Sequence, residues 1–145
     1  MNADSPERAP SDREPREYDD IPGTYVFDGQ HSRLGYALNM FCMSLNEADN
    51  RDAFAADPGG YLDRFDLTAE QRAAIEERKW LEMLQLGGNI YYTFKLAIFD
   101  GLSMQQVGAS MSGVTFEELS QMMIDGGRSA DGNRYQHEWD EKGEN

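Results

Sequence analysis

Apolar side chains recur early in the chain at the spacing of an amphipathic helix. Leu34, Leu38, Phe41 and Leu45 follow one another at intervals of four, three and four residues. Because an α-helix turns once about every 3.6 residues, this spacing places all four side chains on one face. The pattern predicts a helix over residues 31–46.

Two cap signals follow this helix. Asn50 is a candidate N-cap for a short helix that ends at Ala56. Asp57 is a second candidate N-cap, and Pro58 takes the first helical position, where the missing N–H of proline costs no hydrogen bond. The sequence therefore predicts two short helices in succession.

Three capping boxes mark the starts of later helices. In a capping box, two side chains three residues apart satisfy N–H groups that the helix start leaves unpaired. Thr68 with Gln71 opens a predicted helix of about 18 residues that ends at the Gly87-Gly88 pair. The other two boxes open short helices: Ser103 with Gln106, and Thr115 with Glu118.

The segment from Asn89 to Phe99 fits both a helix and a strand. Ile90, Phe94 and Ile98 share a helical face, whereas alternate apolar positions and the aromatic residues favour a strand. No other segment offers a partner strand, and a lone strand leaves its backbone groups unsatisfied. We therefore favour a helix here, and with it an all-α fold.

The composition predicts a single small domain of several short helices with irregular connections and disordered acidic tails. Residues 1–18 combine three prolines with dense charge, so we expect a disordered N-terminal arm. The helical domain is expected over residues 19–135, and residues 136–145 are expected to form a flexible acidic tail. The single cysteine, Cys42, cannot form an internal disulfide.

Acidic residues outnumber basic residues by 27 to 13, which gives a formal net charge of −14. A nucleic-acid-binding protein needs a basic face to neutralise phosphates, so this balance argues against that class and against anionic membrane surfaces. The sequence has neither an apolar run long enough to span a membrane nor the pattern of a secretory signal. We expect a cytoplasmic protein.

The sequence offers no catalytic apparatus of its own. Its two histidines, His31 and His137, lack the spacing to a second ligand that an iron or zinc site requires. Cys42 lies in an apolar helical run without a nearby histidine, which indicates a buried structural thiol. We predict no catalytic residue and no metal ligand in this chain. The simplest interpretation is that the chain is a subunit of a complex with a partner protein.

The segment from residue 101 to 119 also resembles a helix-turn-helix. Its second helix would read DNA, yet that helix carries Glu117 and Glu118 and no basic residue. DNA binding is therefore kept only as an alternative class. The chain also has eight methionines, which either fill the core or form an adaptable contact surface.

Longer motifs give a family resemblance. The runs Asp20-Ile-Pro-Gly-Thr24, Arg33-Leu-Gly-Tyr-Ala-Leu-Asn-Met-Phe-Cys-Met-Ser-Leu45, Gly87-Gly-Asn89 and Gln121-Met-Met-Ile-Asp-Gly-Gly-Arg-Ser129 resemble the small (alpha) subunit family of protocatechuate 4,5-dioxygenase. The resemblance is collinear from about residue 19 to residue 135.

The resemblance implies a subunit of an extradiol dioxygenase. In that family a large (beta) subunit binds Fe(II) and carries the catalytic base, and the small helical subunit packs over the active site in a hetero-oligomer. The implied reaction inserts both atoms of O₂ into protocatechuate, or into a related carboxylated catechol such as gallate, and cleaves the ring between carbons 4 and 5. The alternative is a non-catalytic protein-interaction module of the same fold.

The resemblance also suggests which residues approach the substrate. The family has an aromatic residue after the segment that matches Asp100-Gly-Leu-Ser103, and this chain has Met104 there. Met43 and Leu45 are expected to form a second part of the same lid. Arg128 is a candidate contact for a substrate carboxylate, with an internal ion pair as the alternative.

Overall fold

The computed structural model describes residues 16, 21 and 26–127. The chain divides into a compact unit from Phe27 to Ser129 and a second unit that combines Met1–Val26 with Ala130–Asn145. The described residues of the second unit are Arg16, Ile21 and Val26, and none of them lies in a helix or strand. Apart from Arg16, the predicted arm over residues 1–18 and the predicted tail over residues 136–145 lie outside the described residues.

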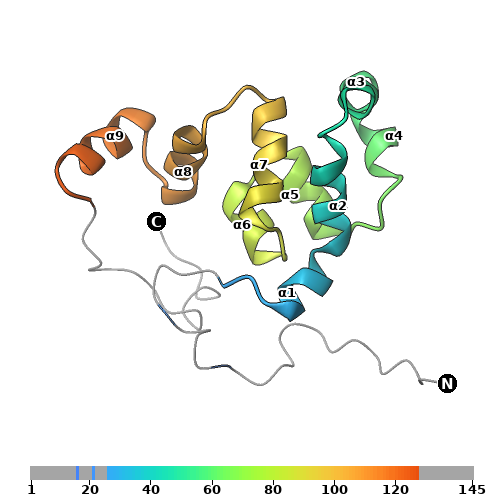
Figure 1. The fold of residues 1–145 in the computed structure, drawn as a ribbon, viewed down its shortest axis with the longest axis horizontal. Coiled ribbons are helices and arrows are strands. Elements are labelled where there is room, and N and C mark those ends of the chain that lie inside the picture. Colours follow the sequence, from blue (N-terminus) through green and yellow to red (C-terminus); the bar gives the residue numbers. More distant parts are fainter. Residues whose placement is uncertain (1–15, 17–20, 22–25, 128–145) are drawn as a thin grey trace. The chain divides into compact units, whose positions relative to one another are not determined.

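The unit from Phe27 onward is built from helices alone over its described residues, which confirms the predicted all-α class (Figure 1). In chain order the helices are α1 (Gly29–Leu34), α2 (Tyr36–Ser44), α3 (Ala48–Ala56), α4 (Pro58–Leu62), α5 (Ala69–Glu76), α6 (Trp80–Gln85), α7 (Ile90–Phe99), α8 (Met104–Ser112) and α9 (Phe116–Ile124).

The core lies where α2 packs against α7, with α3 packed on α4 and α5 on α6 around this pair. Phe41 of α2 is fully buried and contacts Phe54, Tyr61 and Phe65 edge to face, with ring centroids 5.1, 6.1 and 5.6 Å away. Such edge-on ring pairs add to the stabilisation from apolar burial. They attach α3, α4 and the loop after α4 to α2.

The first predicted helix, over residues 31–46, is interrupted. α1 ends at Leu34 and α2 begins at Tyr36, with Gly35 as the joint. The backbone of Gly35 packs directly on Gly87, and a Cβ atom at Gly35 would overlap the Gly87 carbonyl oxygen. The single continuous helix was therefore wrong, because a contact with a residue remote in sequence requires the chain to bend at Gly35.

Two buried side-chain amides hold this joint in place. Asn39 donates from Nδ2 to the Gly87 carbonyl at 3.0 Å and accepts at Oδ1 from the Asn89 N–H at 2.8 Å. Gln71 donates from Nε2 to the carbonyls of Leu34 and Leu86 at 2.9 and 3.1 Å. Gln71 therefore satisfies carbonyls at the ends of α1 and α6, and Asn39 satisfies backbone groups of the turn between α6 and α7.

The predicted helix of about 18 residues after Thr68 is also divided in two. α5 ends at Glu76 and α6 begins at Trp80. Between them Arg78 adopts a left-handed conformation with a φ of 54°. The Lys79 N–H reaches the Ala74 carbonyl at 2.9 Å and the Arg78 N–H reaches Ile75 at 3.2 Å, which are the two hydrogen bonds of a Schellman motif.

Most local predictions of helix starts are confirmed. The capping boxes at Thr68, Ser103 and Thr115 are all formed, and Asp57 caps α4 by accepting from the Gly60 N–H at 3.1 Å. The ambiguous segment after Asn89 is the helix α7.

The cap predicted at Asn50 was wrong. α3 begins two residues earlier, at Ala48, which places Asn50 inside the helix. Its side chain instead donates to the Ser44 carbonyl at 2.8 Å. Asn50 therefore satisfies the end of α2 rather than the start of α3.

Candidate functional site

The start of α8 carries the first residue that the sequence suggested for a substrate lid. Met104 is the first residue of α8, and 45% of its surface is exposed. The Ser103 hydroxyl accepts from the Gln106 N–H at 3.2 Å, and the Gln106 side chain accepts from the Ser103 N–H at 2.8 Å. This capping box fixes where α8 begins and so presents the Met104 side chain at the surface.

The segment before Met104 is held from two sides. Gly101 ends α7 with a φ of 76°, and the Leu102 N–H bonds the Ala97 carbonyl at 2.9 Å. Asp100 accepts from Nε and Nη2 of Arg78 at 2.6 and 3.1 Å. A bidentate pair between guanidinium and carboxylate fixes orientation as well as distance. Arg78 thus positions the loop that leads to Met104.

Arg78 is a residue that the sequence analysis missed. The Arg78 side chain bonds the Ile75 carbonyl through Nη1 at 2.6 Å and lies over the Phe54 ring at 5.8 Å. Helix breaks of this geometry are usually marked by glycine, and no glycine or asparagine stands at this point of the chain. The sequence therefore held no local signal for the break.

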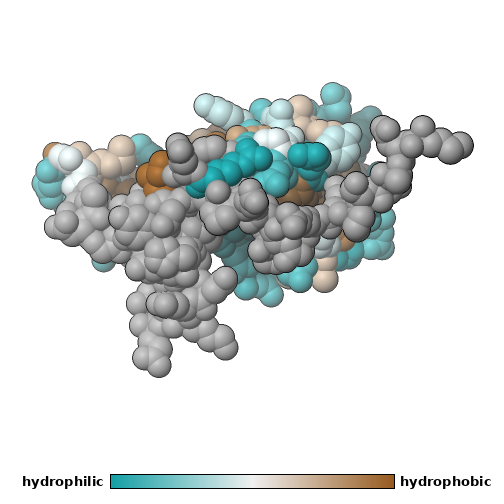
Figure 2. Space-filling view, turned by 90° about the horizontal axis from the view of Figure 1, so that it is seen from below, coloured by the Kyte–Doolittle hydropathy of each residue, from teal (hydrophilic) through white to brown (hydrophobic). Residues whose placement is uncertain are grey.

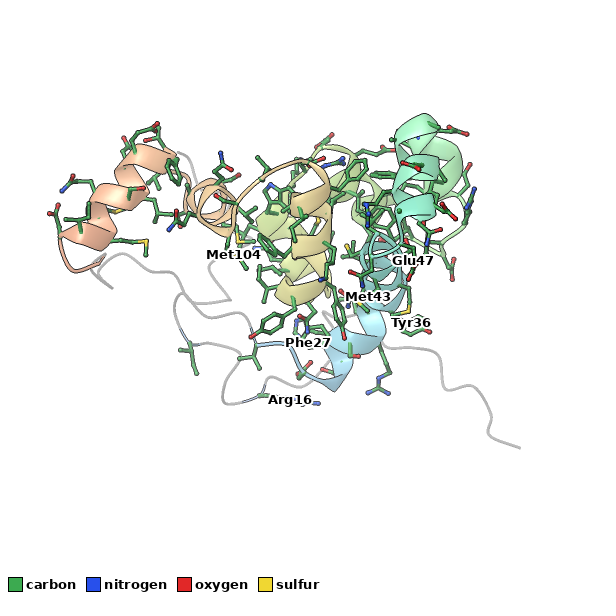
Figure 3. The ribbon with its side chains drawn as sticks, turned by 45° about the horizontal axis from the view of Figure 1, so that its top comes forward. Arg16, Phe27, Tyr36, Met43, Glu47 and Met104 are labelled. Carbon is green, nitrogen blue, oxygen red and sulfur yellow. The ribbon has the colours of Figure 1, made fainter. Side chains whose placement is uncertain are left out.

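Met43 and Leu45, the other two predicted lid residues, lie at the C-terminal end of α2. Leu45 is 3% exposed, and Met43 is half-buried with its Sδ 3.9 Å from Nδ2 of Asn46. Figure 3 shows Met104 and Met43 with the ribbon of α7 between them. The structure thus presents Met104 and Met43 on separate elements, and their shared role as a lid stays a prediction.

A cleft of about 550 Å³ lies between the end of α2, one side of α3 and one side of α7. Its lining is mixed, with apolar, cationic and anionic side chains: Leu45, Asn46, Arg51, Asp52, Ala55, Lys95, Ile98 and Phe99. Arg51 donates from Nη1 to the carbonyls of Leu45 and Asn46, both at 2.9 Å, and thereby caps the end of α2. The charged side chains of this cleft are Arg51, Asp52 and Lys95.

Cys42 is buried, as predicted, and unreactive. Burial raises the pKa of its thiol to about 12, although the positive charge of Arg78 lowers this pKa slightly. Because the thiolate is the nucleophile and the metal ligand, a thiol that stays protonated at neutral pH serves neither purpose. Cys42 acts as a small apolar side chain of the core.

The described residues hold no group of three or more His, Cys, Asp or Glu side chains that could bind a metal ion. His31 is half-buried, and its Nδ1 lies 2.8 Å from Oδ1 of Asp28, the residue that caps α1. Asp28 caps α1 and also accepts from the His31 N–H at 2.9 Å. His137 and Arg128 lie outside the described residues.

The fold and this site define a small all-helical protein over the described residues. The family model of the LigA subunit of the aromatic-ring-opening dioxygenase LigAB matches residues 38–124. This match covers more than half of the chain, and the chain belongs to this family. The matched region begins inside α2 and ends with the last residue of α9.

A gallate dioxygenase of Pseudomonas putida is 26% identical to this chain over 99 residues. The alignment covers 68% of this chain and 29% of the relative, so the chain spans less than a third of the relative's length. Among the described residues, no helix has the length and apolar character needed to cross a membrane.

Proposed function

We propose that this chain is the non-catalytic helical subunit of a two-chain extradiol dioxygenase that opens the ring of a carboxylated catechol. The match to the LigA subunit family from α2 to α9 carries the proposal. The P. putida gallate dioxygenase supports it, because most of that relative's chain lies outside the part that this chain matches. We assign the ring-opening groups to a larger partner chain that corresponds to this remaining part.

The proposed substrates are protocatechuate and gallate, both of which are catechols with a ring carboxylate. The reaction adds both atoms of O₂ and cleaves the ring between carbons 4 and 5. This chain would cover the mouth of the partner's active site, with Met104 as part of the wall and Met43 and Leu45 as a second part. Such a cover excludes water and shapes the pocket around the ring.

The Fe(II) that the family implies does not fit the described residues of this chain. His31 is engaged by Asp28, and the Cys42 thiol is buried and protonated. A 2-His-1-carboxylate iron site needs two free imidazoles and a carboxylate on one face. We therefore assign the iron to the partner chain.

The test is co-expression of this chain with a large chain encoded by a neighbouring reading frame, followed by anaerobic loading with Fe(II). Oxygen uptake and formation of the ring-opened product are then measured with protocatechuate and with gallate. Each chain alone, loaded in the same way, is the control. Iron content is determined on the separated chains, and we expect it in the large chain.

Turnover that requires both chains is the expected result. A stable complex that turns over neither catechol would support the proposed partner chain but would exclude protocatechuate and gallate as substrates. Absence of a complex would favour the alternative function, a protein-interaction module of the same fold.

A further inference from the structure

The helix α9 contributes nothing to the buried core. None of its residues is buried, and α8 is the helix that it packs against. Figure 1 shows α9 extending beyond α8, away from the helices around α2 and α7. A nine-residue helix has little stability of its own in water, so α9 depends on its caps and on whatever covers its apolar side.

The apolar side of α9 is only partly covered. Leu119 packs toward α8, where its Cδ2 lies 3.7 Å from the position that a Cβ on Gly108 would take. Three other apolar side chains of α9 remain exposed: Phe116 at 39%, Met123 at 60% and Ile124 at 78%. We call these three residues the α9 surface. Phe116 and Met123 are seven residues apart, which places them on one side of the helix.

The composition around the α9 surface is that of an interface. The 24 residues from Gly101 to Ile124 contain two charged side chains, Glu117 and Glu118, although 28% of the whole chain is charged. The same stretch contains four of the eight methionines. Protein interfaces are depleted in charge and enriched in methionine at their centres. At the left of Figure 2, hydrophobic side chains lie among hydrophilic ones.

Acidic side chains border the α9 surface. Glu117 and Glu118 lie in the first turn of α9, and Asp125 follows its last residue. A partner that covers this surface therefore needs an apolar patch with basic side chains beside it. A second copy of this chain, with its net charge of −14, offers the wrong charge for that position.

We infer that α9 is the docking helix of this chain, and that its occupant is the ring-opening partner chain, through an apolar patch bordered by basic residues. The inference rests on the proposed function, which supplies that partner. The family match supports it, because the match extends through α9 to residue 124 although α9 adds no buried residue to the core. Docking would bury the exposed side chains and hold the α8–α9 hairpin, including Met104, against the partner.

The test compares two double variants of the full chain for binding to the large chain from the neighbouring reading frame. Met123→Gln/Ile124→Gln makes the α9 surface polar and keeps good helix formers. Tyr36→Gln/Met40→Gln is the matched control, because both residues are exposed, at 65% and 37%, and both lie on α2. Circular dichroism and Tm of each variant establish that the fold is kept.

We expect the α9 variant to bind the large chain at least tenfold more weakly, and the α2 control to bind within twofold of wild type. Hydrogen exchange of the wild-type complex is the second measurement and needs no variant. Amides of residues 116–124 are expected to exchange at least tenfold more slowly in the complex. Glu117→Lys is expected to slow association severalfold at low salt, because it places a positive charge opposite a basic border.

Three outcomes would overturn the inference. Unchanged binding by the α9 variant, or unchanged exchange in α9, would reject this surface and leave the proposed function intact. A dimer of this chain in sedimentation experiments, lost in the α9 variant, would make a second copy the occupant. Absence of any wild-type complex would reject the proposed function itself, and this inference with it.

Discussion

Asn39 and Gly87 lie 48 residues apart, yet the Asn39 amide donates to the Gly87 carbonyl at 3.0 Å inside the protein. The same side chain accepts from the Asn89 N–H at 2.8 Å, and Asn39 is 4% exposed. One amide of α2 thus satisfies both sides of the turn between α6 and α7. The α2–α7 pair at the centre of the core depends on this turn.

Asn39→Ala should destabilise the protein by about 2–4 kcal/mol, because it leaves a buried carbonyl and a partly buried N–H without partners. The free energy of unfolding from urea titration measures the effect. Asn46→Ala is the control, since Asn46 is exposed and its side chain makes only a weak contact with sulfur. Equal stability of the two variants would contradict the role given to Asn39.

Gly35→Ala should cost about 3 kcal/mol or prevent folding, because the added Cβ overlaps backbone atoms of Gly87 that cannot move aside freely. Gly29→Ala is the matched control. A Cβ at Gly29 meets nothing within 4 Å, so this change should be neutral or stabilising by up to about 1 kcal/mol. Thermal unfolding followed by circular dichroism gives the Tm of each variant. A Gly35→Ala protein as stable as wild type would contradict the close packing of Gly35 on Gly87.

Arg78 adopts a backbone conformation that favours glycine, and its side chain binds Asp100. Arg78→Ala and Arg78→Gly both lose the ion pair, but only alanine retains the backbone strain. We therefore expect both variants to be less stable than wild type. The free energy of unfolding of the glycine variant should exceed that of the alanine variant by about 1 kcal/mol. Chemical denaturation of the three proteins gives the comparison. An alanine variant as stable as the glycine variant would show that residue 78 is not left-handed.

Cys42 makes stability depend on pH in the alkaline range. Its ordinary pKa is 9.0, and burial raises the pKa to about 12 in the folded protein. The unfolded chain therefore releases the thiol proton first as pH rises, so this contribution to stability is complete below about pH 9 and is lost toward pH 12.

Cys42→Ala removes this titration, so the stability difference between wild type and variant should shrink between pH 9 and pH 12. Urea titrations of both proteins across this range measure the difference. A thiol reagent at pH 8 should leave native Cys42 unmodified and should label it once the chain is unfolded in urea. Rapid labelling of the native protein would contradict the burial of this thiol.

Met104→Phe should alter substrate preference in the proposed two-chain enzyme. The side chain is exposed at the start of α8, so a flat ring should be accommodated without loss of stability. A ring in place of a flexible thioether changes the shape of the proposed pocket wall, and we expect the ratio of kcat/KM between protocatechuate and gallate to change about threefold or more.

Met40→Phe on α2 is the control for Met104→Phe, because Met40 is also an exposed methionine and lies on a different helix. Its kcat/KM ratio should equal that of wild type. Iron content should be unchanged in both variants. Identical ratios for Met104→Phe and wild type would remove Met104 from the pocket wall.

Several helix starts could be predicted from the sequence because a cap is a local arrangement, although the cap expected at Asn50 was wrong. Thr68, Ser103 and Thr115 each form the capping box that their spacing indicates. The interruptions within the two longer predicted helices could not be predicted, because they are caused by contacts with residues elsewhere in the chain. Gly35 meets Gly87, and Arg78 is held by Asp100.

The candidate site divides in the same way. Net charge argued against nucleic-acid binding, and the longer motifs led to the family that the comparison established. The connection from Arg78 through Asp100 to the loop before Met104 had no signal in the sequence. Arg78 and Asp100 are 22 residues apart, and an ion pair between such distant residues produces no periodic pattern in the sequence.

The sequence by itself determined the fold class and the helix starts marked by capping boxes, because these follow from spacing and local hydrogen bonds. The spacing of Phe116, Leu119 and Met123, three and four residues apart, predicts that they share one side of a helix. Only the tertiary structure decided that Leu119 packs toward α8 while Met123 stays 60% exposed. Burial depends on which remote segments reach a surface, and a local pattern contains no information about them.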